Sequence, residues 1–302
     1  MRQTPIIWLL GVFAILGLLT VGILAWSRPA PVVPTEPAVA KYPRQETIGF
    51  SVENRAIEAY TYSVGSSTSS TNSGQVKLLF VGGIHGGYEW NSVVLAYELM
   101  DYLKTNPDLL PAGVAVTVIP SLNPDGVFAV VGKEGRFAAT EVPVGVDQVP
   151  GRFNANQVDL NRNFDCKWQA ESLWRGRPVS AGTAAFSEPE ARALRDFVLK
   201  NKPQAVVFWH SQANAVYASE CEAGILPETR KIMTAYAEAA GYQAVDTFDA
   251  YAVTGDAEGW LAALDVPAIT VELATHETIE WEKNLAGVKA LLQLFAPGGE
   301  AD

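Results

Sequence analysis

Two of the chain's three histidines lie in segments whose composition suits metal binding. In His85-Gly86-Gly87-Tyr88-Glu89 a carboxylate follows an imidazole by four residues, and the two glycines allow a tight turn between them. His210 follows a short apolar run later in the chain. Two histidines and one glutamate, with a fourth position open to water, form a known type of catalytic zinc site. The sequence therefore predicts one Zn²⁺ per chain, bound by His85, Glu89 and His210.

Glu272 is the candidate catalytic base for such a site. It directly follows the apolar run Ala268–Val271. A catalytic zinc ion lowers the pKa of its water molecule and polarises a carbonyl group. A carboxylate beside that water can take its proton and later deliver it to the leaving amine. The third histidine, His276, has no part in this chemistry, and we expect it to be structural or to lie at a pocket rim.

The polar residues share one position, because each comes at the end of a predicted strand. Short apolar runs rich in Val and Ile are typical of strands buried on both faces of a sheet. Such runs are Val76–Val81 before His85, Val114–Pro120 before Asn123 and Asp125, Ala205–Trp209 before His210, and Ala268–Val271 before Glu272. Ligands bind at the carboxyl ends of strands in open α/β sheets. The shared position therefore indicates a single site.

Helical patterns alternate with these strands. They cover Ser92–Thr105, Glu188–Asn201, Pro227–Ala240 and Glu282–Phe295. Phe50–Tyr62 predicts a hairpin that turns at Glu53-Asn54-Arg55, and Ser66–Gly74 predicts a polar loop. The alternation predicts an α/β fold, with a single domain built on a mixed, mostly parallel twisted sheet with helices on both faces.

In their order along the chain, the polar segments resemble those of the zinc metallocarboxypeptidases of the carboxypeptidase A/B type. They are Gly83-Ile84-His85 through Glu89-Trp90, Asn123-Pro124-Asp125-Gly126, Gly151–Asn156 with Asp159–Phe164, His210-Ser211, Tyr251 with Thr254-Gly255, and Val271-Glu272-Leu273. The pair of segments Gly151–Asn156 and Asp159–Phe164 is especially similar to the regulatory carboxypeptidase branch of that family. The family usually places its first histidine and glutamate three residues apart, whereas here the gap is four and Tyr88 occupies the third position.

The resemblance implies roles for four further residues. Arg152 would stabilise the oxyanion that forms as water attacks, since a fixed positive charge helps most where negative charge develops. Asn161 and Arg162 would bind the terminal carboxylate of a substrate, because an Arg fork matches a carboxylate with two parallel hydrogen bonds. Tyr251 would close over the bound substrate. The implied activity is hydrolysis of a C-terminal amide bond next to a free carboxylate.

Two acidic residues suggest a preference for the terminal side chain. Counting forward from Tyr251 along the resemblance brings Glu258 to the floor of the side-chain pocket, and Asp256 lies two residues earlier. A buried carboxylate favours a cationic partner through a charge-assisted hydrogen bond. The sequence therefore predicts a basic or amine-bearing terminal residue, unless these acids point to solvent on a Gly-rich loop.

Three other functions remain open. The first is a murein peptide hydrolase that cuts the γ-D-glutamyl–diaminopimelate bond. The second is an amidohydrolase or deacylase of small acylated amino acids, for which the full set of Asn-Arg and Tyr segments is not expected. The third is a zinc-free peptide-binding module without catalysis. Loss of His85, Glu89, His210 or Glu272 would mark that module, and all four are present.

The first residues predict export rather than part of the fold. The run Ile6–Trp26 carries no charge and would reach roughly 30 Å as a helix, enough to cross a bilayer. Residues 1–28 are therefore expected to be a membrane anchor, or a cleaved signal segment. Residues 29–45 are expected to form a Pro-rich linker, and residues 46–302 the catalytic domain. The domain would then lie on the extracytoplasmic side of a membrane, or be secreted if the segment is cleaved.

The two cysteines are expected to pair in that setting. Cys166 lies four residues past Arg162 and Cys221 eleven past His210, and both segments must converge on one site. An exported domain permits disulfides, so we predict a Cys166–Cys221 bond that braces the pocket wall, with two reduced thiols as the alternative. The formal net charge of −11 argues against nucleic acid as a partner. The expected partners are a peptide or muropeptide substrate and a membrane.

Overall fold

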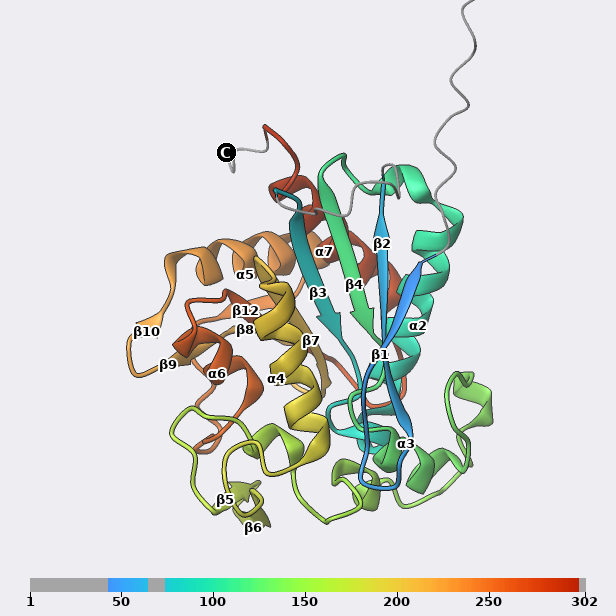
Figure 1. Cartoon of the computed structure of the whole chain (residues 1–302), viewed down its shortest axis with the longest axis vertical. Coiled ribbons are helices and arrows are strands. Elements are labelled where there is room, and N and C mark those ends of the chain that lie inside the picture. The colour runs from blue at the N-terminus through green and yellow to red at the C-terminus, as the bar shows by residue number, and fades with distance from the viewer. Residues whose placement is uncertain (1–42, 65–73, 299–302) are drawn as a thin grey trace, which may run out of the picture. The chain divides into compact units, whose positions relative to one another are not determined.

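Eight strands form one sheet in the order β1-β2-β4-β3-β7-β12-β8-β11 (Figure 1). The computed structural model describes residues 43–64 and 74–298 of the chain. The strands are β1 (Arg44–Phe50), β2 (Ala56–Ser63), β3 (Val76–Val81), β4 (Val114–Ile119), β7 (Ala205–Ser211), β8 (Ala215–Ala218), β11 (Gln243–Val245) and β12 (Ala268–Leu273).

Four neighbouring strands, β4, β3, β7 and β12, run parallel, so their carboxyl ends meet at one edge of the sheet. β11 is parallel to β8, whereas the pairings β1–β2, β2–β4 and β8–β12 are antiparallel. The sheet is therefore mixed and mostly parallel, as predicted. The hairpin that was expected within Phe50–Tyr62 is the turn between β1 and β2.

Helices cover both faces of this sheet. On one face lie α2 (Trp90–Thr105), α5 (Pro227–Ala240) and α7 (Trp281–Leu294), and on the other lie α4 (Pro189–Asn201) and α6 (Ala257–Ala263). Successive strand residues point to opposite faces. Leu78 and Phe80 of β3 accordingly join the core under α2, α5 and α7, while Leu79 and Val81 join the core under α4 and α6.

Near the site, the observed ends of the strands differ from the predicted ones. β7 and β12 continue through His210 and Glu272, so these residues belong to the ends of strands rather than to the loops after them. Two helices that the apolar pattern did not indicate are α3 (Pro124–Val131) and α6, both short. Small hairpins, β5 (Glu171–Trp174) with β6 (Arg177–Ser180) and β9 (Glu220–Cys221) with β10 (Gly224–Ile225), were not expected either.

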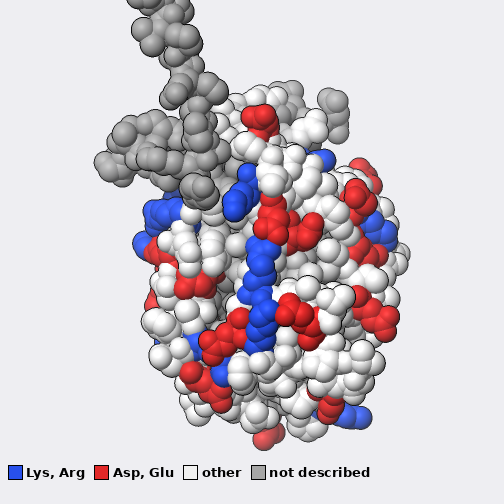
Figure 2. Space-filling view, turned by 90° about the vertical axis from the view of Figure 1, so that its right-hand side faces the viewer, with Lys and Arg blue, Asp and Glu red and all other residues white. Residues whose placement is uncertain are grey.

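The predicted anchor at residues 1–28 and most of the linker lie outside the described residues. Among residues 43–64 and 74–298, no helix has the length and apolar character needed to cross a bilayer. On the face of the molecule in Figure 2, Lys and Arg side chains lie beside Asp and Glu side chains rather than gathering into a separate basic surface.

Candidate metal centre and active site

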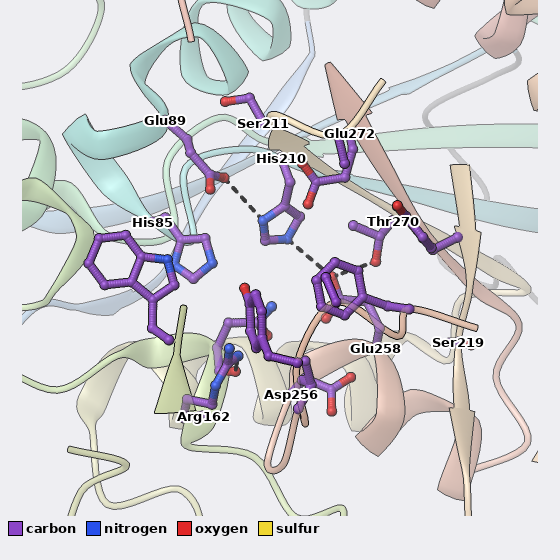
Figure 3. A pocket seen from close by; sticks show the side chains of 18 of the residues that line it. His85, Glu89, Arg162, His210, Ser211, Ser219, Asp256, Glu258, Thr270 and Glu272 are labelled. Atoms are coloured by element: carbon purple, nitrogen blue, oxygen red, sulfur yellow. Dashed lines mark hydrogen bonds and ion pairs between the residues drawn. The ribbon is translucent and has the colours of Figure 1, made fainter. Parts of the chain in front are cut away.

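A cavity of about 530 Å³ opens at the carboxyl ends of the parallel strands. His85 follows β3, His210 lies near the end of β7, and Glu272 lies near the end of β12. His210 and Glu272 are direct register partners in the parallel β7–β12 pair. All three side chains line the cavity, and Figure 3 shows them turned toward it.

A tight turn brings Glu89 to the same cavity, although Glu89 follows His85 by four residues rather than three. Residues Gly86–Glu89 form one 3₁₀ turn that leads into α2. Gly86 has φ +44° and lies so close to the backbone of Gly151 and Gly126 that a Cβ atom would be 2.6–2.9 Å from them. Only glycine fits this position. Tyr88, which lies three residues after His85, packs against the rings of Trp174 and His276.

The three predicted ligands, His85, Glu89 and His210, are brought together by the structure. Each has one candidate donor atom within 4.8 Å of the others, and each residue is only 3% exposed. Zinc bonds of about 2.0–2.2 Å in a tetrahedron need donors roughly 3–4 Å apart. Glu89 Oε2 lies 3.1 Å from His210 Nδ1.

Electrostatics also favour a cation at this position. No hydrogen bond within the described part of the chain satisfies the buried atoms His85 Nδ1 and Glu89 Oε2, although they lie 3.5 Å from Asp159 Oδ1 and 3.1 Å from His210 Nδ1. Burial opposes a charge on His210, but Glu89 and Glu258 outweigh it and raise the pKa of His210 well above its ordinary value. The site therefore attracts positive charge, and its nitrogen and oxygen donors fit zinc.

Glu272 has the properties that a general base requires. Its Oε2 atom is shielded from solvent and has no hydrogen-bond partner among the described residues. Burial, and then the charge of Glu89, raises the pKa of Glu272 to about 7. A base is most effective when its pKa is near the working pH, so this carboxylate is suited to proton transfer near neutrality.

The residues predicted to bind the oxyanion and the terminal carboxylate line the same cavity, and Arg152 Nη1 lies 3.9 Å from Glu89 Oε1. Arg152 is buried and donates two hydrogen bonds to Asp159 Oδ2, at 3.0 and 2.9 Å, with its guanidinium carbon 4.6 Å from the Trp174 ring centre. Asn161 and Arg162 form part of a short 3₁₀ turn after Asp159, and both line the cavity. Asp159 thereby positions Arg152 and the turn that carries the predicted carboxylate-binding pair.

Tyr251 also lines the cavity, and its ring is 6.0 Å from the Arg162 guanidinium carbon. The ring of Tyr251 also packs against that of Phe248, with ring centres 4.9 Å apart. Its side chain is half-buried.

The two acids proposed for side-chain recognition lie at the start of α6 rather than on an exposed loop. Asp256 is the N-cap and accepts a hydrogen bond from the Gly259 N–H, and its pKa is raised to about 6 by burial and by Glu258. Glu258 is 4% exposed and lies 3.1 Å from His210 Nε2. Burial alone would raise the pKa of Glu258. The hydrogen bond and positive charge of His210 outweigh burial and lower this pKa, which keeps the carboxyl ionised.

Several predicted polar residues serve the structure rather than the cavity. Asn123 caps α3 by accepting from the Gly126 N–H, and Asp125 accepts from Ser51. His276 is half-buried, its Nδ1 is 2.7 Å from Ser211 Oγ, and burial lowers its pKa. None of the three lines the cavity.

Three residues of the site were not predicted from the sequence. Asp159 lies 3.5 Å from His85 Nδ1, Trp174 covers Arg152, and Thr270 donates to Glu258. Asp159 could have been found from its place two residues before Asn161-Arg162. Thr270 could have been found from the period of the strand, because it points to the same side as Glu272, two residues later.

The predicted disulfide is confirmed, with Cys166 and Cys221 joined across 55 positions of sequence. Cys166 lines the cavity, and its carbonyl oxygen accepts from the Gly255 N–H at 2.7 Å. The bond therefore ties the segment after Arg162 to the strand region after His210, next to the start of α6.

Loss of this bond should reduce stability without removing the metal ligands. A loop of this length predicts a loss of about 4 kcal/mol in the free energy of unfolding for a double Cys→Ser variant, from the added freedom of the unfolded chain. Urea unfolding of the domain checks this value. Alkylation of unreduced wild-type protein should leave its intact mass unchanged, and addition of two alkyl groups would show that the bond is absent.

Comparison with known proteins agrees with this arrangement. Residues 38–289 match the model of the family described as zinc carboxypeptidase. A γ-D-glutamyl-L-diamino acid endopeptidase of Lysinibacillus sphaericus is 26% identical over 170 residues, which is 53% of this chain and 42% of that protein. Carboxypeptidase D of Mus musculus is 32% identical over 130 residues, 40% of this chain and 8% of that protein. The chain thus spans less than half the length of either relative.

Solved structures share the fold. The murein-tripeptide amidase of Escherichia coli O157 matches with a TM-score of 0.60 at 22% identity, covering 87% of this chain and 97% of that one. Bovine thrombin-activatable fibrinolysis inhibitor matches with a TM-score of 0.61 at 19% identity, covering 83% of this chain and 88% of that one.

Proposed function

The chain belongs to the zinc carboxypeptidase family, and on that premise we propose that it is a metallopeptidase that hydrolyses the C-terminal amide bond of a peptide or muropeptide. One observation carries this proposal. The three candidate ligands His85, Glu89 and His210 meet in the cavity that also holds Glu272, whose pKa is raised to about 7. The presence of all four also argues against a peptide-binding module without catalysis.

The reaction divides its tasks among the residues of the cavity. A bound zinc ion would lower the pKa of a water molecule and polarise the scissile carbonyl. Glu272 would take the proton of that water and deliver it to the leaving amine. Arg152, held by Asp159, would place a fixed positive charge beside the oxygen that becomes negative. The buried setting strengthens that interaction, because the local dielectric is low.

Substrate binding would use the wall formed by Asn161, Arg162 and Tyr251. Arg162 would bind the terminal carboxylate, and the Asn161 side chain would assist it. Asn161 Oδ1 already accepts from the Ala257 N–H at 2.8 Å, which leaves its amide NH₂ group as the donor for a carboxylate. Tyr251 would close over the substrate.

We also propose that the terminal residue bears an amine, with Asp256 as its partner and Glu258 adding negative charge. Both line the cavity. Murein tripeptide is the second candidate substrate for this reason, because diaminopimelate carries both a carboxylate and an amine. A relative's name specifies a γ-D-glutamyl-L-diamino acid substrate, and this chain covers 97% of the murein-tripeptide amidase chain, which supports that candidate.

A substrate panel tests the proposed specificity. Purified domain should hydrolyse peptides ending in Lys or Arg, or murein tripeptide, faster than peptides ending in Leu or Phe. Asp256→Asn retains an N-cap for α6, since Asn caps as well as Asp, yet it removes the charge. Loss of one partner of a buried charge pair costs about 2–5 kcal/mol. The variant should therefore lose amine-bearing substrates selectively, by more than tenfold.

The control in this panel is the peptide that ends in Phe, whose hydrolysis Asp256→Asn should leave nearly unchanged. A wild-type preference for Phe, or an equal loss on both kinds of substrate, would contradict the amine preference and leave the metal chemistry intact. Rapid cleavage of murein tripeptide with slow cleavage of linear peptides would favour the second candidate.

We further propose that the domain acts on the extracytoplasmic side of a membrane, held by residues 1–28. The uncharged run Ile6–Trp26 and the Cys166–Cys221 bond support this location, because disulfides persist mainly in oxidising compartments. In bacterial spheroplasts that express the full chain, external protease should digest a C-terminal tag while a cytoplasmic control protein survives. A protected tag would contradict this location, and loss of residues 1–28 from the mature mass would identify a cleaved signal instead.

A further inference from the structure

The two ring nitrogens of His210 face different carboxylates. Nδ1 lies 3.1 Å from Glu89 Oε2, on the side of the cavity where the three candidate ligands meet. Nε2 lies 3.1 Å from Glu258 Oε1, on the opposite side of the ring. Both contacts are drawn as dashed lines in Figure 3, with the imidazole between the two carboxylates.

Glu258 is itself held in place. Its Oε1 atom accepts a second hydrogen bond from Thr270 Oγ1, at 3.0 Å. It projects from the first turn of α6, whose N-cap is Asp256, while Thr270 lies on β12 two residues before Glu272. Glu258 and His210 are 4% and 3% exposed, so their contact is largely shielded from bulk water. A buried carboxylate with two donors has a fixed orientation.

This geometry determines which nitrogen of His210 can bind a metal. An ionised carboxylate only accepts hydrogen bonds, so a neutral His210 must carry its proton on Nε2 to satisfy Glu258. The lone pair of Nδ1 is then free and points to the side of Glu89. A metal-binding histidine generally donates its other N–H to such a partner, which fixes the ring and makes it a stronger ligand.

We infer that Glu258 is a positioning residue for the metal centre, which holds His210 in the tautomer and orientation that bind zinc. The inference rests on the proposed zinc site. It gives Glu258 a role that differs from recognition of the substrate side chain, because its Oε1 atom is already occupied by His210 and Thr270. The neighbouring Asp256 keeps the recognition role.

Zinc affinity, measured by competition with a chromophoric chelator, separates the two roles of Glu258. Glu258→Leu removes the acceptor and should weaken zinc binding by about 10–100-fold, as is typical when such a partner is lost. Glu258→Gln retains an oxygen acceptor and should lose less. Thr270→Val removes one donor to Glu258 and should weaken binding slightly, whereas Thr270→Ser should bind as wild type does. Asp256→Asn is the matched control and should leave zinc affinity unchanged.

NMR gives a second measurement of the His210 tautomer, and it does not depend on catalytic activity. In zinc-loaded wild-type protein, the ¹⁵N spectrum of His210 should show a proton on Nε2 and metal on Nδ1, and Glu258→Leu should broaden or shift this Nε2 resonance. Thermal unfolding monitors folding of each variant, and the Thr270 pair gives the test if Glu258→Leu does not fold. Wild-type zinc affinity in Glu258→Leu, or equal affinities in the Thr270 pair, would overturn the inference while leaving the zinc site in place. Failure of the wild type to bind zinc would instead overturn the proposed function.

Discussion

Replacing Glu272 by Gln should lower kcat by about 10²–10⁴-fold while zinc remains bound at one per chain. General acid–base catalysis typically contributes a factor of this size. The amide of Gln is nearly the same shape as the carboxylate, but it cannot take a proton from water. Glu272 is not one of the three donors that meet, so metal content should not change. Steady-state kinetics and metal analysis on the same sample provide the measurement.

The pH profile gives this prediction a second readout. Only the ionised form of Glu272 is a base, so wild-type kcat/KM should rise with pH through the pKa of this group. The pKa is raised to about 7 in the metal-free chain from an ordinary 4.5, and the positive charge of zinc would lower it again, so the midpoint should lie between these values. Glu272→Gln should lack this rise. Near-wild-type kcat in the variant would show that another group is the base.

Removal of any one of the three donors should abolish both zinc binding and hydrolysis. Chelation of wild-type protein should reduce hydrolysis to background, and added Zn²⁺ should restore it. His210→Ala and Glu89→Ala should remain inactive at the same zinc concentration, because two remaining ligands hold zinc weakly. His276→Ala is the matched control, since His276 does not line the cavity and should retain both zinc and activity. Full activity of chelated wild-type protein would contradict a metal mechanism.

The strand ends were the part of this molecule that could be predicted best. Val76–Val81, Ala205–Trp209 and Ala268–Val271 are apolar enough to be buried on both faces, and a polar residue follows each. Parallel strands bring these residues to one edge, so His85, His210 and Glu272 were expected to meet. The structure adds that His210 and Glu272 still belong to their strands, which fixes their directions through the β7–β12 register.

The residues around the metal centre were harder to predict from the sequence. The helix α6 has only seven residues, too few for a clear helical period, so Glu258 could be read as part of a loop. Its hydrogen bond to His210 joins residues 48 positions apart and depends on how α6 packs against β12. Spacing along the chain does not encode such a contact. The four-residue gap between His85 and Glu89 likewise needed the 3₁₀ turn at Gly86–Glu89 to be understood.

The proposed chemistry depends on one zinc ion bound by His85, Glu89 and His210. Anomalous X-ray diffraction at the zinc absorption edge, on crystals of the purified domain, would locate this ion. We expect a single strong peak within about 2.0–2.2 Å of one donor atom from each of these three residues, with no peak in crystals of His210→Ala. A wild-type crystal of active protein without that peak, or with its only peak elsewhere, would contradict this metal centre.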